Sequence, residues 1–218
     1  MILTNRLYER KKPDRDANLC IIYCEGSKRE PQYFTYFKGL SSRIILEVVD
    51  AEPEGDNSPM GLYRRACSDI EGSGLDSPAK YEVGEDDQVW FVIDTDTWGS
   101  HIPQLRLGCE KKTNWNVAQS NPCFEVWLYY HLFGEDAASF ELADCSEWKD
   151  HVNKLIPGGF DSRKHPIFIA DAIRNAQAFF RMNGEEVLLG STEMFKLGKT
   201  LYPMIASAIE KARRISRL

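Results

Sequence analysis

The chain has no long hydrophobic run, no paired cysteine motif and no internal repeat. Without an apolar stretch of about 20 residues, no membrane-spanning helix is expected. The first residues also lack an apolar stretch followed by small residues, so we predict a cytoplasmic protein without a signal peptide or a membrane partner. None of the six cysteines forms a Cys-x-x-Cys pair, which argues against a zinc ribbon or a thioredoxin-like redox site.

Positive charge is also scarce. The chain holds 27 Lys and Arg against 33 Asp and Glu, which gives a net charge of −6. This balance argues against a general nucleic-acid coat protein, because such proteins are normally basic. It does not exclude a nuclease, because an acidic metal site lowers the net charge while local basic segments contact phosphate.

The hydrophobic pattern predicts alternating strands and helices. A chain of 218 residues is long enough to form one domain around its own core. Short apolar runs predict strands at 19–24, 44–49, 88–93 and 115–119. Helical segments between them predict an α/β fold with a three-layer, mostly parallel sheet and right-handed crossovers. We expect residues 1–218 to form a single domain, with an α/β core at about 18–133 and a helical extension at about 134–218.

Helices are predicted from spacing, caps and breakers. In the core we expect one after Pro31, one from Ser58-Pro59 to Ile70, a short helix or irregular link at 102–109, and one at 124–133. In the extension we expect helices from a Ser146 cap through Ile156, at 168–182, and at 192–217 with a break near Pro203.

Acidic side chains follow the predicted strands at the points where they end. Glu25 follows the first strand, Asp94 and Asp96 follow the third, and Glu125 comes shortly after the fourth. The carboxyl ends of parallel strands meet at one edge of the sheet, where open α/β sheets bind ligands. Clustered carboxylates repel one another unless a cation lies between them, and Mg²⁺ prefers oxygen ligands and bridges them to phosphate. The pattern predicts a Mg²⁺ site held by Glu25, Asp94 and Asp96, with Glu125 completing the catalytic group and Mn²⁺ able to substitute.

Other polar residues near these strand ends are candidates for contacting phosphate or supporting the metal ligands. Lys28 and Arg29 follow the Glu25 turn at the start of the first helix, where an anion is favoured. Ser120 and Asn121 lie between the fourth strand and Glu125 and can hydrogen-bond a phosphate oxygen or a carboxylate. His131 is the last candidate of this kind.

Each feature also has an ordinary structural explanation. An Asp-x-Asp pair often caps a helix or a turn, and Asn121-Pro122 is most often just a turn. Glu125 is favoured in a first helical turn by the helix dipole. A histidine on an apolar helix face, such as His131, is more often hydrogen-bonded within the core. The functional interpretation depends on all these groups sharing one edge of the sheet.

Three motifs together resemble the RloB-like family over about residues 18–200. They are Cys24-Glu25-Gly26-x-x-x-Glu30-Pro31-x-Tyr33-Phe34, Asp94-x-Asp96 and Ser120-Asn121-Pro122-Cys123-Phe124-Glu125-x-Trp127-Leu128-x-x-His131. That family is similar to TOPRIM proteins, so the resemblance implies a TOPRIM-like sheet in which Glu25, Asp94 and Asp96 are the signature acids. It also implies a metal-dependent nuclease effector of antiviral defence, linked to restriction or abortive infection. RNA and DNA are both open as substrates, and the implied partner is an ATPase of the ABC or overcoming-lysogenization (OLD) type.

Three other hypotheses stay open at this level, as does a homo-oligomeric state. One is a nuclease of the Asp…Glu-x-Lys type that uses Glu110-Lys111-Lys112, which requires those residues to lie on a strand. A second is a non-catalytic regulatory or interaction module that pairs with a defence ATPase. A third is nucleotidyl or primase-like transfer, which would use the same metal site.

Overall fold

The computed structural model describes residues 16–74, 77–95, 98 and 100–215, and it shows a four-stranded parallel sheet. Its strands are β1 (Asn18–Cys24), β2 (Ile44–Val49), β3 (Gln88–Asp94) and β4 (Trp115–Ser120), in the order β2-β1-β3-β4. Each strand agrees with its predicted range to within one residue at either end. β1 and β3 are buried on both faces, which explains their continuous apolar runs.

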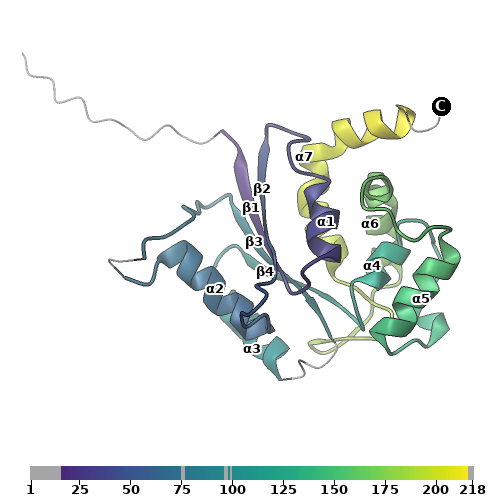
Figure 1. The fold of residues 1–218 in the computed structure, drawn as a ribbon, viewed down its shortest axis with the longest axis horizontal. Helices are drawn as coiled ribbons and strands as arrows, with labels where there is room; N and C mark the ends of the chain where they lie inside the picture. Colours follow the sequence, from purple (N-terminus) through teal and green to yellow (C-terminus); the bar gives the residue numbers. More distant parts are fainter. Residues whose placement is uncertain (1–15, 75–76, 96–97, 99, 216–218) are drawn as a thin grey trace, which may run out of the picture.

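Helices cover both faces of the sheet (Figure 1). α2 (Pro59–Glu71) and α3 (His101–Glu110) lie on one face, and α1 (Arg29–Thr35), α4 (Glu125–Tyr129) and α7 (Met194–Ile215) lie on the other. Alternate side chains of β3 enter the two cores, with Phe91 on the α2 and α3 side and Trp90 on the α7 side. The predicted three-layer α/β fold is therefore confirmed.

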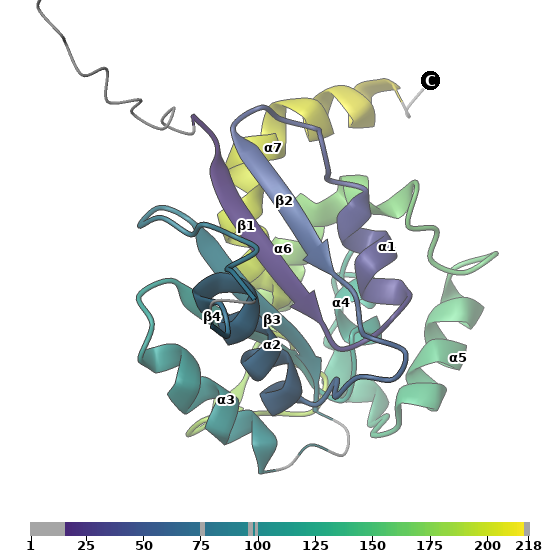
Figure 2. The same cartoon turned by 60° about the vertical axis from the view of Figure 1, so that its left-hand side comes forward.

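The C-terminal part adds helices beside the sheet. It contains η1 (Ala137–Phe140), α5 (Cys145–Leu155), η2 (His165–Phe168), α6 (Ile169–Ala178) and the short hairpin β5 (Met182–Asn183) with β6 (Glu186–Val187). α6 packs on α7, and α7 packs against β4, so the predicted extension forms part of the layer that covers the sheet (Figure 2). No helix in the described part of the chain is both long and apolar enough to cross a lipid bilayer.

Several helix boundaries differ from the predictions. α7 is not broken at Pro203: the proline is exposed, while Leu201, Ile205 and Ile209 keep one buried stripe along the helix. Burial of that stripe outweighs the one backbone hydrogen bond that proline removes.

The predicted helix at 168–182 ends at Ala178, because the chain then turns into the β5–β6 hairpin through Gly184 at φ +61°. The predicted helix at 124–133 is α-helical only from Glu125 to Tyr129. α5 is capped by Asp144 rather than Ser146, since the Asp144 carboxylate accepts the Ser146 backbone N–H at 2.6 Å.

Candidate metal site at the carboxyl edge of the sheet

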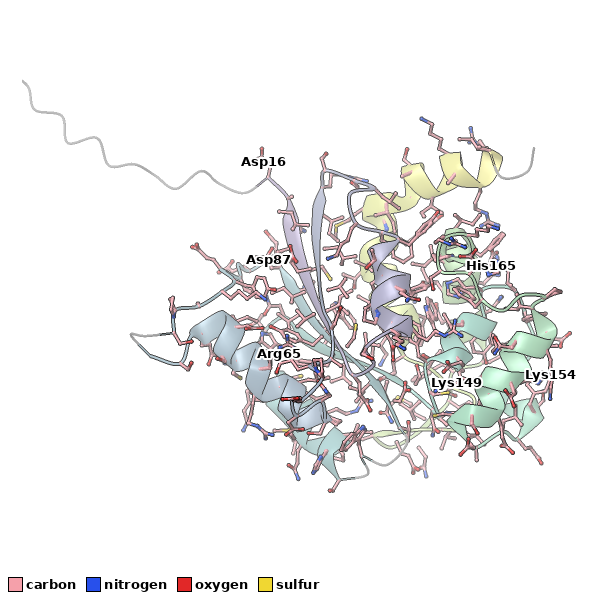
Figure 3. All side chains as sticks on the ribbon, viewed as in Figure 1. Asp16, Arg65, Asp87, Lys149, Lys154 and His165 are labelled. Atoms are coloured by element: carbon pink, nitrogen blue, oxygen red, sulfur yellow. The ribbon has the colours of Figure 1, made fainter. Side chains whose placement is uncertain are left out.

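The strand register brings the ends of β1, β3 and β4 to one edge. Cys24 pairs with Val92, and Asp94 pairs with Ser120. The Glu25 N–H continues the ladder by donating to the Val92 carbonyl at 3.1 Å. In Figure 3, Asp16 and Asp87 mark the opposite, amino-terminal side of the sheet. Glu25, Asp94 and the residues after Ser120 therefore lie on the predicted edge.

The Glu25 carboxylate lies directly at the end of β3. Its Oε2 accepts the Asp94 backbone N–H at 3.0 Å, and its Oε1 accepts the indole N–H of Trp98. The Trp98 ring is stacked on the His101 ring at 5.9 Å between centroids. Two donors, one from the last residue of β3 and one from the loop that follows it, thus fix the orientation of the acid that follows β1.

Glu30 adds another acid that the spacing argument did not single out. It is only 6% exposed, and its carboxylate lies so close to Gly26 that a Cβ at position 26 would overlap its oxygens. The glycine is therefore needed to let the side chain fold over the turn. Burial raises the pKa of Glu30, the nearby Glu125 raises it further, and Lys149, labelled on α5 in Figure 3, opposes the shift.

Asp94 has the most unfavourable environment of these acids. Burial raises its pKa well above the ordinary value, and Glu30, Glu25 and Glu125 raise it further. Its Oδ1 is buried and has no hydrogen-bond partner among the described residues. Glu125 is 4% exposed, and its Oε1 likewise has no partner within that set. Within the described part of the chain, two buried carboxylate oxygens are thus left without a hydrogen-bond donor.

A divalent cation fits this environment, because it would supply the missing partner and relieve the repulsion among the acids. The fit is incomplete in one respect. Across residues 16–74, 77–95, 98 and 100–215, no three Asp, Glu, His or Cys side chains converge closely enough to hold a metal ion. Asp96, the other predicted ligand, lies outside the described residues. Its role, like the metal itself, stays a prediction.

Ser120 and Asn121 make contacts within the protein. The Ser120 hydroxyl is 1% exposed and lies 2.7 Å from the Thr192 hydroxyl. The Asn121 side-chain amide donates to the Val187 carbonyl at 2.7 Å, and its backbone N–H donates to the Ser191 carbonyl at 2.9 Å. Both residues tie the segment before α7 to the end of β4, so their predicted contact with phosphate has no support in this geometry.

His131 lies in an aromatic core. Its Nδ1 is 2.9 Å from the Trp127 carbonyl oxygen and its Nε2 is 3.0 Å from the Tyr33 hydroxyl, which occupies both ring nitrogens. Burial lowers its pKa to about 3, so the ring is neutral at pH 7. The structure gives His131 the role of a hydrogen-bonded core residue and does not bring it to a phosphate.

Lys28 and Arg29 do lie just beyond the Glu25 turn. Lys28 is exposed and borders a surface pocket of about 800 Å³, together with Ser27, Gln32, Phe160 and Arg163 among others. Arg29 donates to the Phe160 carbonyl at 3.5 Å, and its charge opposes the raised pKa of the neighbouring Glu30. Because α1 has only seven residues, we attribute any phosphate contact here to the side-chain charges rather than to the helix end.

The Asp…Glu-x-Lys alternative is not supported. Glu110 is the last residue of α3, and Lys112 follows in the turn before β4 rather than on a strand. The Lys112 ammonium instead forms an ion pair with Glu71 of α2.

Sequence reasoning missed Glu30, Trp98 and Lys149. Glu30 was visible as part of the first motif, but only the close approach at Gly26 shows that its carboxylate turns back towards the strand end. No sequence pattern indicates that Trp98 and Lys149 lie near the acids, because their proximity depends on the loop after β3 and on the docking of α5.

Comparison with known proteins gives one result. A family model described as "RloB-like protein" matches residues 20–201, which is most of the chain and agrees with the resemblance seen in the motifs. Neither the curated proteins nor the solved structures contain a match.

Proposed function

We propose a nuclease function for this chain, which belongs to the RloB-like family. It would hydrolyse phosphodiester bonds in RNA or DNA with Mg²⁺ bound at the carboxyl edge of the sheet, as an effector of phage defence. The observation that carries this proposal is the group of buried acids in which the Asp94 Oδ1 and the Glu125 Oε1 have no partner among the described residues.

The acids have different roles in the proposed reaction. Asp94 and Asp96 would hold the ion, and Mg²⁺, when bound, would activate a water and offset charge on the phosphate. Glu25 is held by the Asp94 N–H and the Trp98 indole, so it can ligate the ion or accept a proton from water at a fixed place. Lys28, beside the pocket that follows the Glu25 turn, would contact the nucleic-acid backbone.

Cleavage of RNA and DNA pools tests this function. We expect cleavage by the wild-type protein with Mg²⁺ or Mn²⁺, none with EDTA, and a loss of about a hundredfold or more in Asp94→Ala. Lys112→Ala is the matched control and should keep full activity, because Lys112 pairs with Glu71 away from the acids. Equal cleavage by Asp94→Ala and wild type would reject the proposal.

A regulatory module that partners an ABC or OLD-type ATPase is the second candidate function. It is favoured by the absence, within the described residues, of three convergent metal-binding side chains. Assays with and without an ATPase of the ABC or OLD type separate the two functions. A nuclease whose activity needs Asp94 in either condition supports the first, and a change in ATPase activity without any cleavage supports the second.

A further inference from the structure

A second buried acid lies at the start of α7. Glu193 is 0% exposed, and its Oε2 accepts a hydrogen bond from the Arg106 guanidinium of α3 at 2.6 Å. Its Oε1 accepts the Lys196 ammonium at 2.6 Å, and the Gln119 backbone N–H approaches Oε2 at 3.3 Å. The Glu193 N–H donates in turn to the Gln119 carbonyl at 2.7 Å. The beginning of α7 is thus fastened to the end of β4.

Arg106 extends this contact to the Gln119 side chain. Its Nη2 donates to the Gln119 Oε1 at 2.7 Å. A guanidinium has only donors, so it fixes which end of the amide faces it and directs the NH₂ group the other way. That Nε2 donates to the Thr95 hydroxyl at 2.8 Å. A chain of hydrogen bonds therefore runs from Glu193 through Arg106 and Gln119 to Thr95, and the bonds made by Arg106 are charge-assisted.

Thr95 stands between Asp94 and Asp96 in the sequence, and it is held at both its backbone and its side chain. Its N–H lies 2.9 Å from the Ser120 carbonyl and 3.0 Å from the Pro122 carbonyl, and its hydroxyl donates to the Ser120 carbonyl at 2.9 Å. The same hydroxyl accepts the hydrogen bond from Gln119, so it acts as donor and as acceptor at once. The residue that leads from Asp94 to Asp96 thus has a fixed conformation.

Stability alone gives a weak reason for these contacts. A buried ion pair adds little net stability compared with apolar residues of the same volume, because desolvation offsets the attraction. The Nε of Arg106 is buried and unpartnered among the described residues, so the group is not arranged for the largest number of hydrogen bonds. A fixed geometry around Thr95 is what the group does provide.

We propose that Gln119, oriented by Arg106 and Glu193, is a positioning residue that holds Thr95 and thereby sets the end of β3, which carries Asp94, for metal binding. This inference rests on the proposed function, because it requires a divalent ion at Asp94. It also gives the C-terminal helix a part in the site: the contact made by its preceding residue, Glu193, reaches the acids through Gln119 and Thr95.

Mn²⁺ binding to the full-length protein, measured by calorimetry and by electron paramagnetic resonance, tests the inference alongside thermal unfolding. In Gln119→Leu we expect the affinity for Mn²⁺ to fall about tenfold to a hundredfold, which is typical when a group that orients a metal ligand is lost. Thr192→Val is the matched control, because it removes two buried hydrogen bonds from the same junction, to Ser120 and to the Met194 N–H, without removing the Gln119–Thr95 contact. It should lower the unfolding temperature but leave the Mn²⁺ affinity unchanged.

A double variant shows whether Gln119 acts through Thr95. Because both residues serve one contact, Thr95→Val with Gln119→Leu should weaken Mn²⁺ binding no more than either change alone. Unchanged affinity in Gln119→Leu, or an equal loss in Thr192→Val, would overturn the positioning role while leaving the metal site intact. If the wild-type protein binds no Mn²⁺, the metal site itself is wrong and the positioning role falls with it.

Discussion

Glu193 on one side, and Asp94 with Glu125 on the other, lie near the ends of β3 and β4 in opposite environments. Glu193 has both carboxylate oxygens matched by cations of the protein itself, Arg106 and Lys196. Asp94 and Glu125, the open group, each keep a buried oxygen with no partner in the described part of the chain, and burial together with nearby acids raises the pKa of Asp94. The comparison shows that cations of the protein itself compensate Glu193, whereas we propose that the open group binds a cation from outside.

The largest effect on the free energy of unfolding should come from removing Glu193, the acid that is paired with cations of the protein itself. Glu193→Ala leaves Arg106, whose side chain is only 17% exposed, without its main partner. Removing one partner of a buried pair typically costs about 3–5 kcal/mol. Urea unfolding at pH 7 measures the loss of unfolding free energy.

Asp161→Ala is the control for that experiment, because it removes the partner of Arg163, whose side chain is 87% exposed. It should lower the unfolding free energy much less than Glu193→Ala, because ion pairs in contact with water contribute little. Similar losses in the two variants would contradict the difference between the buried and the exposed pair.

At the open group, bound metal should change the unfolding temperature more than the substitution of an acid does. A ligand present at a hundred times its Kd stabilises the folded state by about 2.7 kcal/mol. We expect Mn²⁺ to raise the unfolding temperature of the wild-type protein accordingly and to leave that of Asp94→Asn unchanged. In EDTA, Asp94→Asn should be at least as stable as wild type, because the change removes a carboxylate from a repulsive site.

The stability expected for Asp94→Asn in EDTA is opposite to the usual result of removing a paired buried acid, which lowers the free energy of unfolding. A variant that is strongly destabilised in EDTA, as expected for Glu193→Ala, would place Asp94 in the same class as Glu193 and remove the contrast between the two groups.

A smaller effect concerns the buried base His131. Its pKa is lowered to about 3 in the folded protein, from an ordinary value of 6.5. As the pH falls, the unfolded chain therefore binds a proton at His131 before the folded protein does. The contribution of the neutral ring to the free energy of unfolding is fully present above pH 6.5, and the folded state loses about 1.4 kcal/mol per pH unit between 6.5 and 3.

At pH 5 this amounts to about 2 kcal/mol relative to pH 7. His131→Gln cannot titrate and should show a correspondingly smaller loss of unfolding free energy between pH 7 and pH 5. Urea unfolding at the two pH values checks it, and an identical pH dependence in both proteins would mean that His131 is not the group that titrates.

The smallest effect is expected at the exposed Lys112–Glu71 pair. Lys112→Ala should change the unfolding free energy by less than about 1 kcal/mol, because such surface pairs contribute little. Mn²⁺ affinity should be unchanged. A lost affinity would contradict the assignment of metal binding to the open group, because Lys112 pairs with Glu71 away from those acids.

Much of the fold could be predicted from local pattern. The continuous apolar runs of β1 and β3 fixed the central strands, and their ends placed Glu25 and Asp94 at one edge. The sequence could not indicate that Glu30 folds back over Gly26, since that depends on a close approach in three dimensions. Nor could it link Gln119 to Glu193, which are far apart in the chain and meet only when α7 docks on β4.

The wrong helix predictions have a common physical cause. Local propensity predicts a break at Pro203 and a cap at Ser146, but the buried stripe of α7 and the better-placed Asp144 carboxylate determine the outcome. The site roles of His131 and Ser120 stay predictions, and the structure places both residues in hydrogen bonds within the protein.

The central claim, that the open group of acids binds a divalent ion, is tested most directly by a crystal soaked in Mn²⁺ and measured at the manganese absorption edge. The account predicts an anomalous peak within coordination distance of the Asp94 carboxylate, on the side of Glu25 and Glu125. A well-ordered site without such a peak, or a peak only at other acids, would contradict it.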